Sequence, residues 1–290
     1  LSKFVKRLYG YTGYFQLYQM PFSKLGLMDY CEKRDLFAPE GLAPFENLAD
    51  LLLRSGIRHH ISDWRRSDEF NLRAGCEAIA GGARFLFLYT AELDGLLHQH
   101  VLHPEIVHKK LEWYRRNIEA LLSAAKSSGR ACRLTVFSDH GMTPLTRTVD
   151  VRSAIEKTGL VFGKDYGACY DSTMFRVTCL RPDARERIEE AMKKFSDCGR
   201  WLSDDEERRY GIHREDRMFG DAIFLMNPGV QIVPSDMGSH ALNGMHGFAP
   251  EDRDSEAAIL SNAPIPVFVN RVADYFELMK MRLEELAKRP

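Results

Sequence analysis

The sequence lacks the features that would mark a specialised class of protein. Its six cysteines are widely spaced, and no two are separated by only two residues, which argues against a disulfide framework and a zinc knuckle. No apolar run approaches the ~18 residues needed to cross a bilayer. The unpatterned thiols favour a reducing compartment such as the cytoplasm. Because the chain begins at Leu1, an N-terminal targeting segment would not be seen.

An excess of either charge is also absent. The 40 basic and 41 acidic side chains nearly cancel, and the net charge of −1 gives no bulk attraction to a nucleic acid polymer or an anionic membrane. What is present is ordinary: 290 residues, 44% of them hydrophobic and 28% charged. Such a chain is long enough to bury a sizeable core in one large domain.

The order of the predicted elements favours an α/β fold. Strand-like and helix-like segments alternate along most of the chain, which indicates a mostly parallel sheet flanked by helices. Apolar residues at helical spacing predict helices that end at Gly56, that span residues 109–125, and that open at Pro182. Strands are predicted at residues 57–61, 84–90, 133–137, 173–179, 222–226, 230–233 and 266–269. We expect residues 1–290 to form a single domain, in which the charge-rich region 145–218 is a candidate inserted lid.

Three short stretches carry the residues that could do chemistry: LYTAELDGLLHQH, SDHGM and NGMHGF. The candidate residues in them are Asp94, His98, Asp139, His140 and His246. Taken singly, each stretch is weak evidence. An Asp and a His four residues apart usually form a surface pair or a helix cap, a DHG tripeptide is often a turn, and a loop histidine is usually solvated.

Two physical points make the three stretches more informative together. The first two follow predicted strands, and open α/β sheets bind their ligands beyond the carboxyl ends of the strands. Two carboxylates and three imidazoles are also suitable donors for zinc or manganese. Five ligands exceed what one tetrahedral ion needs, so the set indicates a two-metal hydrolase site.

Taken in order, DGLLH, SDHGM and MHGFAPE resemble the alkaline phosphatase superfamily, and most closely its type I phosphodiesterase/nucleotide pyrophosphatase branch. The resemblance covers about residues 45–270. It implies an alkaline phosphatase-like fold and hydrolysis of a phosphodiester or pyrophosphate bond in a small phosphoester or nucleotide. It also implies two zinc ions, with manganese as an alternative: Asp94, His98 and His246 would bind one ion, and Asp139 and His140 the other.

The first motif of that family has no counterpart in this sequence. In the family, a strand ends in an aspartate and is followed by a Thr or Ser nucleophile, which attacks phosphorus to give a covalent intermediate. Thr12 has no preceding apolar strand, and Ser62-Asp63 has the reverse order. We therefore expect the chain to lack its N-terminal strand and nucleophile, through truncation or natural loss, and turnover by the chain alone is in doubt.

Two other functions are compatible with the same residues. A phosphoglycerate or phosphosugar mutase of the superfamily would use a similar metal set, and a noncatalytic relative would have lost the first motif. The aromatic stretch LYGYTGYFQLYQMPF near the N-terminus is expected to pack over the sheet, although its rings could also stack on a nucleobase.

Overall fold

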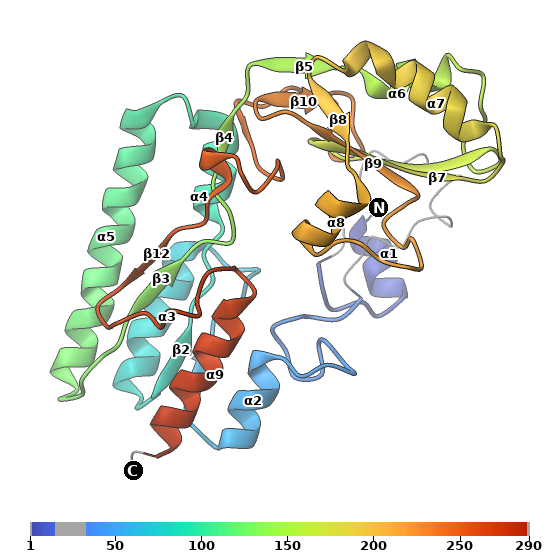
Figure 1. Cartoon of the computed structure of the whole chain (residues 1–290). Coiled ribbons are helices and arrows are strands. Elements are labelled where there is room, and N and C mark those ends of the chain that lie inside the picture. The colour runs from blue at the N-terminus through green and yellow to red at the C-terminus, as the bar shows by residue number, and fades with distance from the viewer. Residues whose placement is uncertain (1, 15–32, 289–290) are drawn as a thin grey trace.

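The computed structural model describes residues 2–14 and 33–288, and shows a mixed α/β structure (Figure 1). Its helices are α1 (Ser2–Leu8), α2 (Leu48–Ser55), α3 (Asp68–Ala80), α4 (Glu92–His100), α5 (Pro104–Ser127), α6 (Val151–Glu156), α7 (Ala184–Met192), α8 (Asp204–Tyr210) and α9 (Asp274–Ala287), with 3₁₀ turns η2 (Lys193–Phe195) and η3 (Arg253–Ser255). Its strands are β1 (His59–Ile61), β2 (Phe85–Phe87), β3 (Thr135–Phe137), β4 (Thr143–Pro144), β5 (Arg147–Val149), β6 (Tyr166–Tyr170), β7 (Met174–Cys179), β8 (Gly199–Trp201), β9 (Ala222–Met226), β10 (Val230–Ile232), β11 (Gly244–Met245) and β12 (Ile259–Ser261). None of the helices in this part of the chain has the length and hydrophobicity to cross a lipid bilayer. Most of the aromatic stretch expected to pack over the sheet lies outside the described residues.

Helix α2 illustrates how local sequence defines an element. Its N-terminus has a capping box, in which the Asn47 side chain accepts from the Asp50 backbone and the Asp50 side chain accepts from the Asn47 backbone. Gly56 ends the helix in the left-handed conformation, as the sequence predicts. The buried face, with Leu52 fully shielded, packs against Leu283 of α9.

The strands form several small sheets. In the described residues β1 pairs with β2 and β5 with β10 in parallel, whereas β3 pairs with β12 and β4 with β11 antiparallel. The largest sheet has the order β6-β7-β9-β8 and is antiparallel throughout. The expected single, mostly parallel sheet is therefore not seen in this part of the chain. The alternation of apolar and polar residues along a strand indicates which face is buried, but not whether the neighbouring strand runs parallel or antiparallel.

The strand predicted at residues 266–269 is wrong. This segment is a turn, and Val267 is 96% exposed. The strand of this region is β12, a few residues earlier, which pairs with β3. Pro264 and Pro266 lack the backbone N–H that a ladder needs, so the apolar run after them is poorly suited to a sheet.

The region 145–218 is a folded part of the molecule. It supplies β6, β7 and β8, and helices α6 and α7 cover one face of their sheet (Figure 1). The core there is continuous and includes the buried side chains of Tyr166, Phe175, Ile188 and Met192. The central strand β9 follows residue 218 and shares that core, so the packing unit extends beyond the region.

Candidate metal centre

Helix α4 presents Asp94 and His98 on one face. Asp94 lies in its first turn, where a carboxylate interacts favourably with the helix dipole, and His98 lies in its last turn. His98 Nε2 is 3.5 Å from Asp94 Oδ1. His98 Nδ1 lies 2.9 Å from the carbonyl oxygen of Gly244, which can only accept, so Nδ1 carries a proton and the lone pair of the neutral ring is on Nε2.

Strand β11 approaches α4 closely because residue 244 is a glycine. A Cβ at this position would lie 2.9 Å from the carbonyl oxygen of Leu97. The backbone N–H of Asn243 donates to the carbonyl of His98 at 2.9 Å, which ties the strand to the end of α4. The loop that carries His246 is therefore held beside the helix that carries Asp94.

His246 follows β11 in a tight turn. Gly247 has a φ of +90°, which favours glycine, and the Thr173 hydroxyl donates to its carbonyl at 2.9 Å. The turn places His246 Nε2 3.7 Å from Asp94 Oδ1. A lone histidine in a glycine-rich loop is thus fixed by contacts on both sides.

His140 comes from the end of β3 and stacks on His246. Their ring centroids are 3.7 Å apart, with 19° between the planes. His140 Nδ1 lies 2.8 Å from the carbonyl oxygen of Gly141, so Nε2 is again the free nitrogen, and it is 3.5 Å from Asp139 Oδ1. A Cβ on Gly141 would overlap the carbonyl oxygen of Asp254, so the glycine of this motif is required by packing.

The electrostatics of the cluster suit a cation. Asp94 Oδ1 is shielded from water, and no donor among the described residues makes a hydrogen bond of normal geometry to it. Contact with His98 lowers the pKa of Asp94, which keeps the carboxyl ionised. The same contact raises the pKa of His98, so a metal ion would bind His98 in competition with a proton on Nε2. Burial, reinforced by neighbouring His140, lowers the pKa of His246 and favours the neutral ring that a metal requires.

The structure brings the five predicted residues into one neighbourhood. Donor atoms of Asp94, His140 and His246 all lie within 4.8 Å of one another. His98 joins them through Asp94, and its ring centroid is 5.2 Å from that of His246. Asp139, whose side chain is 72% exposed, joins them through His140. The grouping differs from the expected one, because His140 lies with Asp94 and His246 as well as beside Asp139.

This donor set fits a divalent ion. Imidazole nitrogens and carboxylate oxygens are ordinary zinc ligands, and a shielded carboxylate oxygen without a donor is the group that a bound cation would satisfy. The free Nε2 atoms of His98 and His140 follow from the backbone carbonyls that fix the opposite nitrogen of each ring.

A second cluster was not recognised from the sequence. Asp204, Glu207 and His213 also bring donor atoms within 4.8 Å of one another, in the charge-rich region that the sequence indicates as a candidate lid. Glu207 is buried, but its carboxylate already faces His213 at 3.2 Å and Arg217 at 3.4 Å. The arginine supplies the positive charge, so this cluster is an internal ion-pair network. The signal in the sequence is Gly211, which ends α8 in the left-handed conformation and lets the chain turn back so that His213 faces Glu207.

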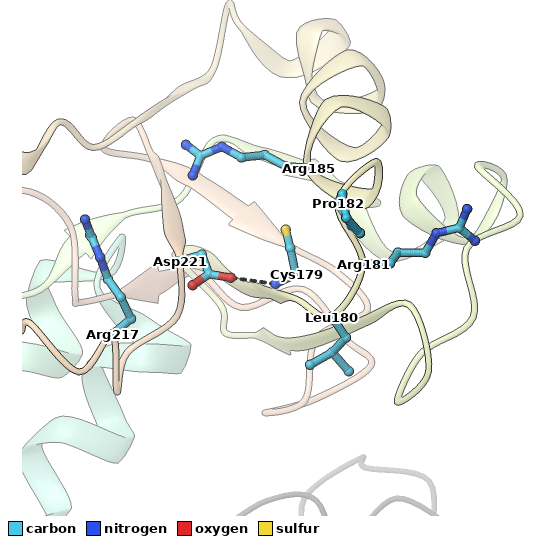
Figure 2. A pocket seen from close by; sticks show the side chains of 7 residues that line it. All are labelled: Cys179, Leu180, Arg181, Pro182, Arg185, Arg217 and Asp221. Atoms are coloured by element: carbon cyan, nitrogen blue, oxygen red, sulfur yellow. Dashed lines mark hydrogen bonds between the residues drawn. The ribbon is translucent and has the colours of Figure 1, made fainter.

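A cavity of about 470 Å³ lies where β7 ends and α7 begins (Figure 2). Its lining residues are Cys179, Leu180, Arg181, Pro182, Arg185, Arg217 and Asp221. Arg181 points away from the other two arginines and pairs with Asp183, and Asp221 accepts a hydrogen bond from the Cys179 backbone at 2.7 Å. None of the five metal-centre candidates lines this cavity, so it is a separate feature.

Comparisons with known proteins identify the family and the fold. The sequence model of the family described as Type I phosphodiesterase / nucleotide pyrophosphatase matches residues 29–249. Murine ectonucleotide pyrophosphatase/phosphodiesterase 5 superposes with a TM-score of 0.64 at 16% identity, covering 81% of this chain and 69% of that one. The human protein gives 0.62 at 15% identity with the same coverage. Phosphonoacetate hydrolase from Sinorhizobium meliloti gives 0.54 at 17% identity, covering 74% of this chain and 56% of that one. No curated protein matches the sequence.

Proposed function

Since this chain belongs to the type I phosphodiesterase/nucleotide pyrophosphatase family, we propose that its Asp–His cluster is the metal centre of a hydrolase that acts on phosphodiester or pyrophosphate bonds. The observation that carries the proposal is the convergence of Asp94, His140 and His246 from three separate segments, with donor atoms within 4.8 Å of one another. The shielded oxygen of Asp94, to which no described residue makes a hydrogen bond of normal geometry, also supports it.

In this proposal Asp94, His98 and His246 hold one zinc ion and Asp139 and His140 hold a second, with manganese as the alternative metal. When bound, such ions polarise a phosphoryl oxygen and stabilise the charge on the leaving oxygen. The protein's own contribution is orientation. Backbone carbonyls fix the rings of His98 and His140, and the β11 contact with α4 sets the separation between His98 and His246.

The substrate class we propose is a small phosphodiester or a nucleotide. An inactive variant of the murine relative has been solved in complex with AMP, which makes a nucleotide a reasonable ligand for this fold. The folded region 145–218 is proposed as the part that covers the substrate. The nucleophilic hydroxyl of the reaction is not assigned to a residue of this chain.

The test is metal-dependent hydrolysis by the full product of the gene that encodes this chain. Bis(p-nitrophenyl) phosphate should be cleaved faster than p-nitrophenyl phosphate. A chelator should abolish the reaction, and added zinc or manganese should restore it. The Asp94→Asn variant should be inactive, whereas His103→Ala, which changes a half-exposed histidine facing Glu105, should not. Absence of any metal-dependent turnover would favour a noncatalytic relative, and activity on a phosphosugar as a mutase would replace the hydrolase proposal.

A further inference from the structure

Helix α4, which carries Asp94 and His98, begins without a cap of its own. Its N-cap residue is Ala91, which has no side-chain acceptor for the unpaired N–H groups of the first turn. The Asp68 carboxylate, on α3, takes that role: the N–H of Ala91 donates to Oδ1 at 3.0 Å and the N–H of Glu92 to Oδ2 at 3.1 Å. Asp68 is only 2% exposed, so water does not compete for these bonds.

The capping is reciprocal. The Glu92 side chain accepts a hydrogen bond from the Asp68 backbone N–H at 3.0 Å, so the first turns of α3 and α4 cap each other. Lys110 on α5 binds the second oxygen of Glu92 at 2.6 Å. The contact resembles a capping box, but its two residues come from different helices.

Helix α5 also fixes the Asp68 carboxylate. The Tyr114 hydroxyl donates to Asp68 Oδ2. Burial and the neighbouring Asp68 raise the pKa of Tyr114, so the hydroxyl keeps its proton and stays a donor. The Asp68 carboxylate therefore accepts three hydrogen bonds, from the backbone N–H groups of Ala91 and Glu92 and from the Tyr114 hydroxyl. It cannot turn away from α4 without losing them.

Other buried polar groups hold the connection between β2 and α4. The backbone N–H of Tyr89 donates to the Ser62 hydroxyl at 2.7 Å, and the Asn71 side chain donates to the Tyr89 carbonyl at 3.4 Å. Ser62 and Asn71 are 3% and 1% exposed. The segment that leads to the metal-centre helix is thus fixed by Ser62, which follows β1, and by Asn71 of α3.

From this arrangement we propose that Asp68 is a positioning residue of the metal centre, acting through the first turn of α4. Asp94 lies in that turn, so fraying of the turn would displace its carboxylate. Outer contacts that orient a metal ligand commonly change metal affinity by 10–100-fold when removed. The inference rests on the proposed function, because it assumes that Asp94 binds a metal ion.

The test compares Asp68→Ala with Glu69→Ala in the full chain. Glu69 is the matched control, since it is the neighbouring acidic residue in the same turn of α3 but is exposed. Zinc affinity is measured by titration. The visible spectrum of the cobalt-loaded protein is measured at metal saturation. We expect Asp68→Ala to weaken zinc binding roughly tenfold and to change the cobalt band, and Glu69→Ala to leave both unchanged. Global destabilisation alone would not alter the spectrum of a saturated site.

Two further variants keep the test decisive. Asp68→Asn preserves the side-chain volume and one acceptor oxygen, and serves if Asp68→Ala does not fold; it should shift the cobalt band in the same direction. Tyr114→Phe removes one donor to Asp68 and should have a smaller effect. Zinc affinity and a cobalt spectrum like those of the unsubstituted chain in the Asp68 variants would overturn the positioning role alone. Failure of the unsubstituted chain to bind either metal would instead overturn the proposed metal centre.

Discussion

At Asp94 one carboxylate oxygen is shielded from water and faces two imidazoles, His98 at 3.5 Å and His246 at 3.7 Å. Leaving a buried acceptor without a partner costs about 1–3 kcal/mol, and a charged one costs more. The protein retains this carboxylate at the point where three segments meet. A bound cation would offset that cost.

The first prediction concerns His246. Replacing it by alanine removes the imidazole that this loop contributes to the proposed metal centre. His246→Ala should therefore lose at least about tenfold in zinc affinity. Equilibrium dialysis with metal analysis measures the effect. His103→Ala is the control because this side chain faces Glu105 and solvent. Unchanged metal content in His246→Ala would remove His246 from the site.

The second prediction concerns Gly141. A methyl group at this position would overlap the carbonyl oxygen of Asp254, so Gly141→Ala must displace backbone on one side. We expect a loss of about 1–3 kcal/mol in the free energy of unfolding, and weaker zinc binding because His140 moves with its neighbour. Gly238→Ala is the control, since a Cβ there meets no atom within 4 Å. Urea unfolding distinguishes the two, and equal stability of the variants would contradict the prediction.

Among the elements, helices α4 and α8 both have a capped N-terminus, but the capping side chains come from different places in the chain. Helix α8 has a capping box within its own sequence, in which Ser203 and Glu206 accept from each other's backbone. Helix α4 has its cap supplied by Asp68 from another helix. A helix that caps itself can be recognised from four residues, whereas a cap from another element appears only when the two helices have packed.

The third prediction follows from the α8 cap. The Ser203 backbone N–H, assisted by Arg200, lowers the pKa of Glu206 to about 2. A carboxyl whose pKa is lower in the folded state stabilises the protein above its unfolded pKa, and this contribution is lost as the pH falls from about 4.5 to about 2. The difference in stability between the unsubstituted chain and Glu206→Gln should therefore be larger at pH 6 than at pH 3.

Urea unfolding at the two pH values measures this difference. Glu215→Gln, in the exposed loop after α8, is the control variant. A difference between the unsubstituted chain and Glu206→Gln that stays constant from pH 6 to pH 3 would show that the carboxylate is not held by the cap.

In the whole molecule, the candidate metal centre joins segments that are distant in sequence. Its residues follow β2, β3 and β11, and the described strands of those segments belong to three different small sheets. The core of the large antiparallel sheet with α6 and α7 extends to this region, because it includes Met245 and Phe248 on either side of His246 (Figure 1). Two metal ions, one bound by residues 94, 98 and 246 and the other by residues 139 and 140, would therefore join segments whose strands belong to different small sheets.

The fourth prediction concerns metal removal. Because the ligand-bearing segments come together only in the folded chain, a metal that binds the folded state should stabilise the whole molecule. At a free zinc concentration 100 times the dissociation constant the gain is about 2.7 kcal/mol, so excess zinc should raise Tm and a chelator should lower it. The shift should be lost in His246→Ala. Equal Tm values with zinc and with chelator in the unsubstituted chain would contradict a metal centre that depends on folding.

The sequence alone determined the features that depend on neighbouring residues. Residues 94 and 98 share a helix face because of their spacing, Gly56 ends α2, and the DGLLH and SDHGM stretches follow strands as predicted. These follow from backbone geometry over a few residues. Tertiary structure alone decided that His140 stacks on His246, that Asp68 caps α4, and that β3 pairs antiparallel with β12. Such contacts join residues far apart in the chain, and they depend on which surfaces pack together, which the local pattern of hydrophobic and polar residues does not specify.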